Sequence, residues 1–555
     1  MDTLRNLLRT SPPARPQTVS ERVVGALTTP LDPRAFSPQN PHFIPLPGSK
    51  PIPVWAAILP PLSYYVALTL LPPLSHHGAF SSSAVAATGK WQTLATSLRF
   101  ALATISIVTF AVLPFAYHVP GSAILTYQLG LVGCYGACRV FDVFFLSYPR
   151  VPRRLRLDTS KPATGRQYPS ELPNEQWPTQ DHPVGFKARL WWALDLLISM
   201  RGVGWDYASP DVRHDTNPWQ PPSRRQLHRA FFKIGPVLAV CLFGLRAMHA
   251  SDYMVTGMSI TRLPVGLRPL FVAFTGVSLY ALFDFGYTVV SALALPVLRL
   301  IAPSATAAAQ PSEELHNVDF FPLLNPVNLT ELRSVRCFWS KCWHRLFHRA
   351  FLVYGVLPFQ RLALLIEYAF RWIVARAQGR AAPSTPFADG RPSPARHADP
   401  GRVLNRGQGD WGKVVGAFVA SGAIHAVSER AALGGRLALP PQHATVLLAA
   451  GKGGSHGSGI WSVTSFLPPF SGAGEFTFFL LNGLAVVVEA VVGKIVMAQR
   501  RKELQKAKGS SVQPRWYDIY IQLTWTLTVL LTSGELFVEG WLASGLVDEL
   551  TFRSH

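Results

Sequence analysis

Nine long apolar stretches alternate with polar segments along the chain. They lie near residues 52–72, 94–116, 121–147, 231–249, 267–301, 350–375, 413–434, 474–497 and 519–547. Because a helix needs roughly 20 mostly apolar residues to cross a bilayer, the pattern predicts an all-α, polytopic transmembrane bundle of about 8–10 spans. The stretch at 267–301 is too long for one upright span and contains Pro296, so it is either a tilted helix or a helix with a re-entrant turn.

The polar segments divide the chain into six regions. Four arginines between Arg150 and Arg156 favour the cytosolic side for the segment that contains them. No apolar core of a cleaved signal peptide occurs before the first span. In chain order we expect a disordered polar tail at 1–50, transmembrane helices at 51–148, a cytosolic or interfacial segment at 149–230, transmembrane helices at 231–376, a disordered loop at 377–411 and C-terminal transmembrane helices at 412–555.

Composition agrees with a membrane protein. The 555 residues are 48% hydrophobic and only 15% charged, whereas soluble domains carry about a quarter charged residues. The formal net charge is +21, and the basic residues interrupt the apolar stretches. This placement favours contact with the membrane surface or an anionic substrate, and no nucleic-acid partner is expected. The five cysteines form no zinc pattern and no disulfide framework.

One histidine stands inside an apolar stretch of small residues, "GAFVASGAIHAVSER" at 416–430. On a helix, Ser421, His425 and Ser428 share a face, and Glu429 follows one turn beyond the histidine. An ionisable side chain at membrane depth is costly and by default marks a functional site. The alternative is a histidine that only hydrogen-bonds to a neighbouring carbonyl.

A second stretch, Leu329 to Phe351, is rich in aromatic and basic residues. Its periodicity predicts an amphipathic helix, with aromatic residues on one side and histidines and cations on the other. The aromatic side includes Trp339 and Trp343, and the basic side includes Lys341, His344 and His348, with Arg345 at its edge. An interfacial helix that contacts lipid headgroups would look the same. The two histidines have metal-ligand spacing, but the surrounding cations would repel a metal, and we expect none.

A third stretch, "WWALDLLISMRGVGWDY" at 191–207, predicts an apolar helix that the two glycines of "RGVGW" end. Arg201 would then lie at the C-terminus of this helix. It could cap the helix and reach to the membrane interface, or it could hold an anion such as a phosphate.

Together these stretches resemble a known family. "SMRGVGWDY" (199–207), "NLTELRSVRCFWSKCWHRLFHRAF" (328–351) and "FVASGAIHAV" (418–427) are similar, in this order, to the wax-synthase-like branch of the membrane-bound O-acyltransferases, especially its fungal members. "FFLLNGLAVVVEA" (478–490) fits a following helix of that family. The resemblance covers roughly residues 190–550.

The resemblance implies a bundle that encloses a reaction chamber, with His425 as the general base and His344 as a second catalytic residue that orients or polarises a thioester. It further implies residues that bind the substrate or coenzyme A: Arg201, Trp205, Trp339, Lys341, Trp343, Arg345, His348 and Ser421. The chain also departs from the family pattern. Ser340, Lys341 and Cys342 stand where the branch often shows Gly and two Arg, and Ala426 stands where many members carry an acid.

The expected activity is transfer of an acyl or acetyl group from acyl-coenzyme A or acetyl-coenzyme A to a hydroxyl of a hydrophobic acceptor. The acceptor would be a fatty alcohol, a sterol or a terpenoid-type metabolite that enters from the membrane lipids, and no tightly bound cofactor is expected. A multi-pass protein that uses a cytosolic donor is expected in the endoplasmic reticulum.

Two other functions remain open. A transporter or channel could use Asp284 and Glu489, although the stretches show no internal symmetry. A catalytically inactive relative would be consistent with Ala426. A membrane prenyltransferase is excluded, because no Asp-x-x-Asp motif occurs.

Overall fold

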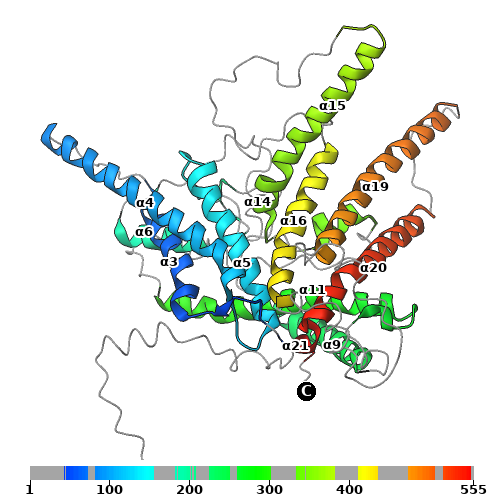
Figure 1. Cartoon of the computed structure of the whole chain (residues 1–555), viewed down its shortest axis with the longest axis horizontal. Helices are drawn as coiled ribbons and strands as arrows, with labels where there is room; N and C mark the ends of the chain where they lie inside the picture. Colours follow the sequence, from blue (N-terminus) through cyan, green and yellow to red (C-terminus); the bar gives the residue numbers. More distant parts are fainter. Residues whose placement is uncertain are drawn as a thin grey trace, which may run out of the picture.

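The structure, a computed structural model, is built almost entirely of helices (Figure 1). It describes residues 43, 45–72, 82–154, 182–183, 185–200, 202, 205–207, 224–250, 259–301, 333–343, 346–381, 410–434, 473–506 and 517–551. The regions expected to be disordered, 1–50 and 377–411, lie largely outside these residues.

The N-terminal helices form one packed group. Their shared core includes Leu68, Val140 and Phe144, which are almost fully buried. Two short parallel strands, Lys50–Pro51 and Tyr117–His118, pair the segment before α3 with the segment after α4. The elements of this part are β1 (Lys50–Pro51), α3 (Val54–Thr69), α4 (Ser82–Ala116), β2 (Tyr117–His118), α5 (Ala123–Phe141), its π-helical continuation η2 (Asp142–Leu146) and α6 (Phe186–Ile198).

The remaining elements complete the bundle. In Figure 1, α11 runs across the lower ends of α16 and α20, and α15, α16, α19 and α20 rise side by side above it. The elements are α8 (Arg224–Arg229), η4 (Ala230–Ile234), α9 (Gly235–His249), η5 (Ile260–Arg262), α11 (Arg268–Ile301), α13 (Val335–Cys337), η7 (Phe338–Cys342), α14 (His348–Ala350), η8 (Phe351–Val356), α15 (Leu357–Ala377), α16 (Asp410–Leu433), α19 (Ala473–Lys506), α20 (Asp518–Ser544) and α21 (Leu546–Leu550).

Every predicted apolar stretch is helical, and seven helices in the described ranges are long and apolar enough to cross a membrane. This supports a multi-pass membrane protein. The seven are Gln92–Ala116, Ala123–Leu146, Leu227–His249, Arg268–Val290, His348–Ala377, Ala473–Glu503 and Asp518–Ser544.

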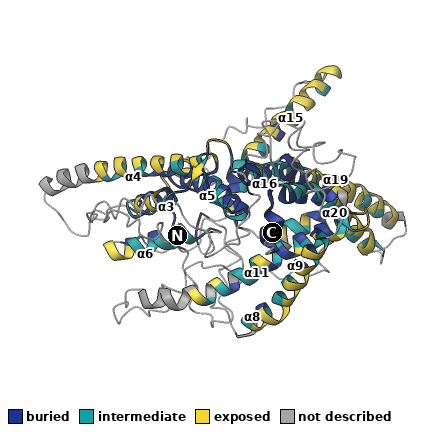
Figure 2. Cartoon of the chain, turned by 60° about the horizontal axis from the view of Figure 1, so that its bottom comes forward, coloured by how far each residue is buried: buried dark blue, intermediate teal, exposed yellow. Residues whose placement is uncertain are grey.

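Two of the nine predicted stretches are not among these seven helices of the described ranges. Helix α3 has only 16 residues, and α16 carries Lys413, Glu429 and Arg430. Because α5, α15, α19 and η8 pack around α16, this helix is mostly enclosed by protein, as its dark blue and teal colouring in Figure 2 shows. An enclosed helix need not be apolar on every side.

Small residues bring the backbone of α16 very close to its neighbour η8. A Cβ atom added at Gly416 would overlap the carbonyl oxygen of Gly355, and one added at Gly355 would overlap that of Gly416. Such a crossing allows extensive backbone contact between helices in a membrane. The small residues of this predicted stretch therefore do pack against a neighbouring helix.

Two long stretches can now be compared with their predicted shapes. Almost all of the stretch 267–301 forms one uninterrupted helix, α11, rather than a helix with a re-entrant turn. The stretch from Leu329 to Phe351 was predicted as one amphipathic helix, and this is wrong. Its described part consists of short helical pieces, and the backbone at Trp343 is extended, with φ −85° and ψ 158°.

The last described helix, α21, closes the bundle onto the start of α5. The carboxylate of Glu549 accepts hydrogen bonds from the Ser122 hydroxyl at 2.9 Å and from the backbone N–H groups of Ala123 and Ile124 at 2.5 and 3.0 Å. A negative charge is stabilised at a helix N-terminus by its unpaired N–H groups. This contact fixes the beginning of the helix that carries Tyr127.

Candidate functional site

His425 lies in the middle of the bundle and hydrogen-bonds to Tyr127. Its Nδ1 atom is 2.7 Å from the Tyr127 hydroxyl oxygen, and 14% of its side chain is exposed. Across the described residues, no protein group hydrogen-bonds to Nε2 of this ring. His425 therefore has one nitrogen held by the protein and one nitrogen available for another partner.

A buried carboxyl group, that of Glu475, lies on the far side of Tyr127. The Tyr127 hydroxyl is 2.9 Å from Oε2 and 3.1 Å from Oε1 of Glu475. The indole N–H of Trp541 donates to Oε1 at 2.5 Å. From Nδ1 of His425 to Oε2 of Glu475 the distance is 3.6 Å, so Tyr127 bridges the two groups.

A second buried acid, Glu429, lies beside this cluster. Its Oε2 accepts the backbone N–H of Glu475 at 3.4 Å, while its Oε1 has no hydrogen-bond partner. A Cβ atom on Gly540 would occupy the position of this Oε1 atom. Glycine at 540 therefore leaves the space in which the Glu429 carboxyl group lies.

One face of α19 brings the histidine and the predicted aromatic segment together. Glu475, Phe479, Asn482 and Glu489 are spaced by four, three and seven residues, so they lie along one stripe of the helix. Glu475 contacts Tyr127, and the Phe479 ring stacks on His425 with centroids 4.6 Å apart. The two later residues of the stripe hold the segment that contains Trp339.

Trp339 is docked on this stripe by one hydrogen bond and several ring contacts. Its Nε1 donates to Oδ1 of Asn482 at 3.1 Å, and its ring centroid is 5.4 Å from that of Phe479. At the start of the segment, the Glu489 carboxylate accepts the N–H groups of Val335 and Arg336 at 2.7 and 3.3 Å. Trp339 thus reaches His425 through a single intervening ring.

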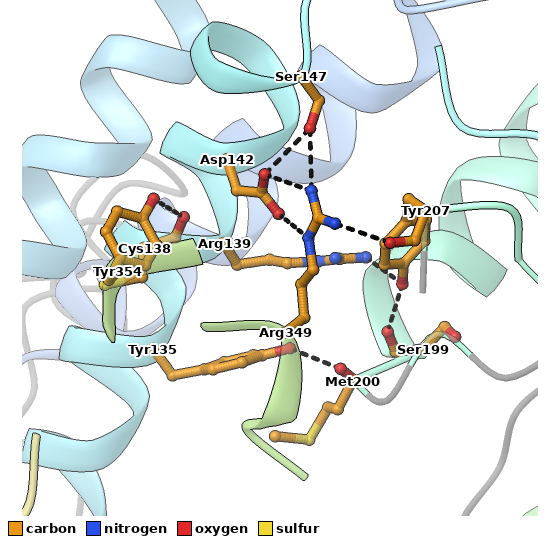
Figure 3. A network of polar contacts seen from close by, with 10 residues as sticks. All are labelled: Tyr135, Cys138, Arg139, Asp142, Ser147, Ser199, Met200, Tyr207, Arg349 and Tyr354. Carbon is orange, nitrogen blue, oxygen red and sulfur yellow. Dashed lines mark hydrogen bonds and ion pairs between the residues drawn. The ribbon is translucent and has the colours of Figure 1, made fainter. Parts of the chain in front are cut away.

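A buried ion pair joins the other two predicted stretches (Figure 3). The Arg349 guanidinium donates to both oxygens of Asp142, at 2.7 and 2.8 Å, and to the Tyr207 carbonyl at 2.9 Å. The ring of Tyr207 lies 4.2 Å from the guanidinium carbon of Arg139, and its hydroxyl donates to the Ser199 carbonyl at 3.0 Å. Tyr207, and through it Ser199, is therefore held against α5 with the help of Arg349 from the end of the 328–351 stretch.

Helix α6 ends just before the glycine-containing segment that was predicted to end it, three residues before Arg201. Helix α6 ends at Ile198, and Gly202 has φ +74°, where a side chain would also overlap the Tyr207 ring. Trp205, predicted to bind substrate, is fully buried and packs on Trp192 at 5.6 Å. Its ring also contacts the guanidinium of Arg154 at 4.9 Å.

The other predicted residues include three in the described ranges and four that lie at least partly outside them. Ser421 is buried on α16, one turn before His425. Trp343 packs 5.7 Å from Trp339, and His348 begins α14. Three predicted residues, Arg201, His344 and Arg345, lie outside the described residues, as does the side chain of Lys341.

The two polar partners nearest to the imidazole were missed by the sequence analysis. Glu475 could have been found by the rule that selected His425, because it is an acid at the beginning of a long apolar stretch. Tyr127 carries no such signal, since tyrosine is common in apolar helices. Asp284, named above as a residue that a transporter could use, forms an ion pair with Arg229, which donates to it at 2.6 Å.

The arrangement can take up or deliver a proton at Nε2 while the protein holds Nδ1. Within the described ranges, no group of three His, Cys, Asp or Glu residues could hold a metal ion. A neutral imidazole that is fixed at one nitrogen is a common form of general base.

Comparisons with known proteins add no family. No protein-family model, curated protein or solved structure matches the chain.

Proposed function

We propose that the protein is a membrane-bound acyltransferase that moves an acyl or acetyl group from acyl-coenzyme A to a hydroxyl of a hydrophobic acceptor. His425 is the general base. The observation that carries the proposal is its imidazole inside the bundle, held at Nδ1 by Tyr127 and without a protein partner at Nε2.

The reaction needs one proton acceptor and no covalent intermediate. Nε2 takes the proton of the acceptor hydroxyl as its oxygen attacks the thioester carbonyl carbon. A carbon–oxygen bond forms, the carbon–sulfur bond breaks, and the leaving thiolate receives the proton back from Nε2. The ring ends in its starting state, and positioned proton transfer of this kind contributes about 10²- to 10⁴-fold.

The surroundings of the ring suit a water-sensitive, hydrophobic reaction. Phe479 stacks on His425, and Phe537 contacts it edge to face at 6.4 Å. Apolar rings exclude the water that would hydrolyse the donor. They also suit an acceptor that arrives from the hydrocarbon of the membrane, such as a fatty alcohol, a sterol or a terpenoid-type metabolite.

The donor would bind toward the basic segments that flank the helices. The candidates are the residues that the family resemblance implies: Arg201, Lys341 and Arg345 for the phosphates of coenzyme A, and His344 for the thioester carbonyl. Trp339 supports this placement for Lys341, His344 and Arg345, because it connects their segment to the Phe479 ring that stacks on His425. A cytosolic donor and a membrane-embedded chain point to the endoplasmic reticulum.

The proposal is tested with microsomes that contain the protein. They are incubated with radiolabelled acetyl-, octanoyl- and palmitoyl-coenzyme A together with hexadecan-1-ol, cholesterol or extracted lipids, and the products are separated and identified. We expect a labelled ester and an equal amount of free coenzyme A, neither of which forms in microsomes without the protein.

A transporter would give a different result. The buried acids Glu429 and Glu475 beside His425 are also typical of proton relays in transporters. Movement of labelled substrate across sealed vesicles without release of free coenzyme A would therefore contradict the acyltransferase proposal and favour transport.

A further inference from the structure

We infer that Tyr127 and Glu475 are positioning residues that hold the proton of the neutral His425 ring on Nδ1 and leave the lone pair of Nε2 free for the acceptor hydroxyl. The inference rests on the proposed function for its role in catalysis. The arrangement of the three groups stands on the structure alone.

The donors and acceptors of the three groups support a proton on Nδ1 of His425. A tyrosine hydroxyl has one proton to donate and can also accept. Both Glu475 oxygens lie within 3.1 Å of the Tyr127 oxygen, so its proton points at the carboxyl group. The same oxygen is then an acceptor toward Nδ1 of His425, 2.7 Å away, and Nδ1 must carry the hydrogen.

The direction of the hydrogen bonds from His425 to Tyr127 to Glu475 depends on the charge of Glu475. Its carboxyl group also receives the Trp541 N–H, and it stands in the first turn of α19. Two hydrogen-bond donors and a helix N-terminus favour the carboxylate form, whereas burial and the neighbouring Glu429 carboxyl group oppose it. A carboxylate can only accept, so it draws the Tyr127 proton toward itself and away from the histidine.

The three residues of this hydrogen-bonded group lie far apart in the sequence. His425 is 298 residues from Tyr127, and Tyr127 is 348 residues from Glu475. Three different helices, α5, α16 and α19, each contribute one group. The contact of Glu549 with the start of α5 fixes the helix that carries the middle group.

A consequence for catalysis follows. During the reaction the ring becomes positively charged for a moment, and a carboxylate linked through a phenol stabilises that charge. Without the link, the ring can rotate or take the other tautomer, in which Nε2 carries the hydrogen and cannot act as a base. Partners that orient an imidazole in metal sites contribute about 10- to 100-fold to activity, and we expect a similar loss of kcat here.

The test is the nitrogen-15 NMR spectrum of purified protein in lipid nanodiscs, labelled with ¹⁵N-histidine. It is recorded at a pH of about 8.5, above the ordinary histidine pKa of about 6.5. The His425 signals are those absent from His425→Ala. We expect the wild-type ring to show Nδ1–H, and Tyr127→Phe and Glu475→Gln to shift it toward Nε2–H.

Two matched variants control for the loss of a buried group elsewhere. Tyr354→Phe removes another phenol that hydrogen-bonds to α5, at the Cys138 carbonyl. Glu539→Gln changes a carboxyl group on α20 that accepts a hydrogen bond from the backbone N–H of Ile260. Neither change should alter the His425 signals, and ester formation from palmitoyl-coenzyme A and hexadecan-1-ol should stay near the wild-type rate in both.

The spectrum separates this inference from the proposed function. A wild-type ring with Nε2–H, or a tautomer that Tyr127→Phe leaves unchanged, overturns the inference even if the protein makes esters. The expected tautomers in a protein that forms no ester would confirm the positioning role and contradict the proposed function instead. The wild-type spectrum decides the tautomer even if a variant does not fold.

Discussion

The Phe479 ring lies almost parallel to the imidazole of His425, with the ring centroids 4.6 Å apart and an angle of 29° between the planes. The other neighbours of Phe479 include Trp339 at 5.4 Å. This ring is therefore the contact through which the aromatic segment of the chain reaches the histidine.

The first prediction concerns this contact. Phe479→Leu keeps an apolar side chain but removes the flat surface under the imidazole. Aromatic pairs contribute about 0.5–1.5 kcal/mol beyond their buried area, which corresponds to a roughly 2- to 10-fold lower kcat if the contact orients the ring. The measurement is the initial rate of ester formation by purified protein at saturating donor.

An exposed phenylalanine serves as the control. Phe243 is 75% exposed on α9, and Phe243→Leu should leave the rate unchanged. Equal rates for Phe479→Leu and the wild-type protein would show that stacking does not orient His425.

The second prediction concerns the buried ion pair between Arg349 and Asp142. Arg349→Met leaves the Asp142 carboxylate buried without its cation. Breaking such a pair on one side costs about 3–5 kcal/mol. We expect a large fall in the midpoint of thermal unfolding. The midpoint is measured in detergent by fluorescence-detected size exclusion after heating.

Two comparisons sharpen this test. Arg371→Met removes an exposed pair with Glu367, 3.7 Å long, and should cost less than about 1 kcal/mol. The double variant Arg349→Met, Asp142→Leu removes both charges and should regain much of the lost stability. If Arg349→Met and Arg371→Met shift the midpoint equally, the buried pair does not stabilise the fold more than an exposed pair does.

The third prediction concerns the backbone crossing of Gly355 and Gly416. Gly416→Ala places a methyl group against the Gly355 carbonyl, so the two helices must separate. Overpacking of this kind costs about 1–3 kcal/mol, and the unfolding midpoint should fall.

The control is a helical glycine with free space around it. A Cβ atom on Gly276 meets nothing within 4 Å, so Gly276→Ala should be neutral or stabilise the helix by up to about 1 kcal/mol. A Gly416→Ala protein as stable as the wild type would mean that the crossing is looser than the structure shows.

The sequence predicted the helices well because spans depend on local composition. Each of the nine apolar stretches is helical, and the close packing around the small residues of 416–430 is present. The number of spans was less predictable. Helix α16 has charged residues near its ends and a polar site along its length. These polar residues are tolerated because other helices surround α16.

The prediction of one helix for residues 329–351 was wrong because helical periodicity contains no information about tertiary contacts. Glu489 caps the N–H groups of Val335 and Arg336, and Asn482 binds the Trp339 indole. These contacts position a short helix on α19, and the chain then leaves it in the extended conformation at Trp343. No local pattern contains this information.

The site was predictable in part. His425 stood out because an ionisable group inside an apolar stretch is rare. Its partners come from helices that are 298 and 50 residues away along the chain, and no feature of a single sequence shows which helices will meet. The placement of Tyr127 and Glu475 therefore required the structure.

The most direct test of the account is the rate of transfer by His425→Ala. Purified wild-type and variant proteins, matched for folding by size exclusion and thermal unfolding, are incubated with the donor and acceptor that give the highest wild-type rate. Loss of the general base should lower kcat by about 10²- to 10⁴-fold with little change in stability. A folded His425→Ala protein that forms the ester at the wild-type rate would contradict the role of this histidine as the base.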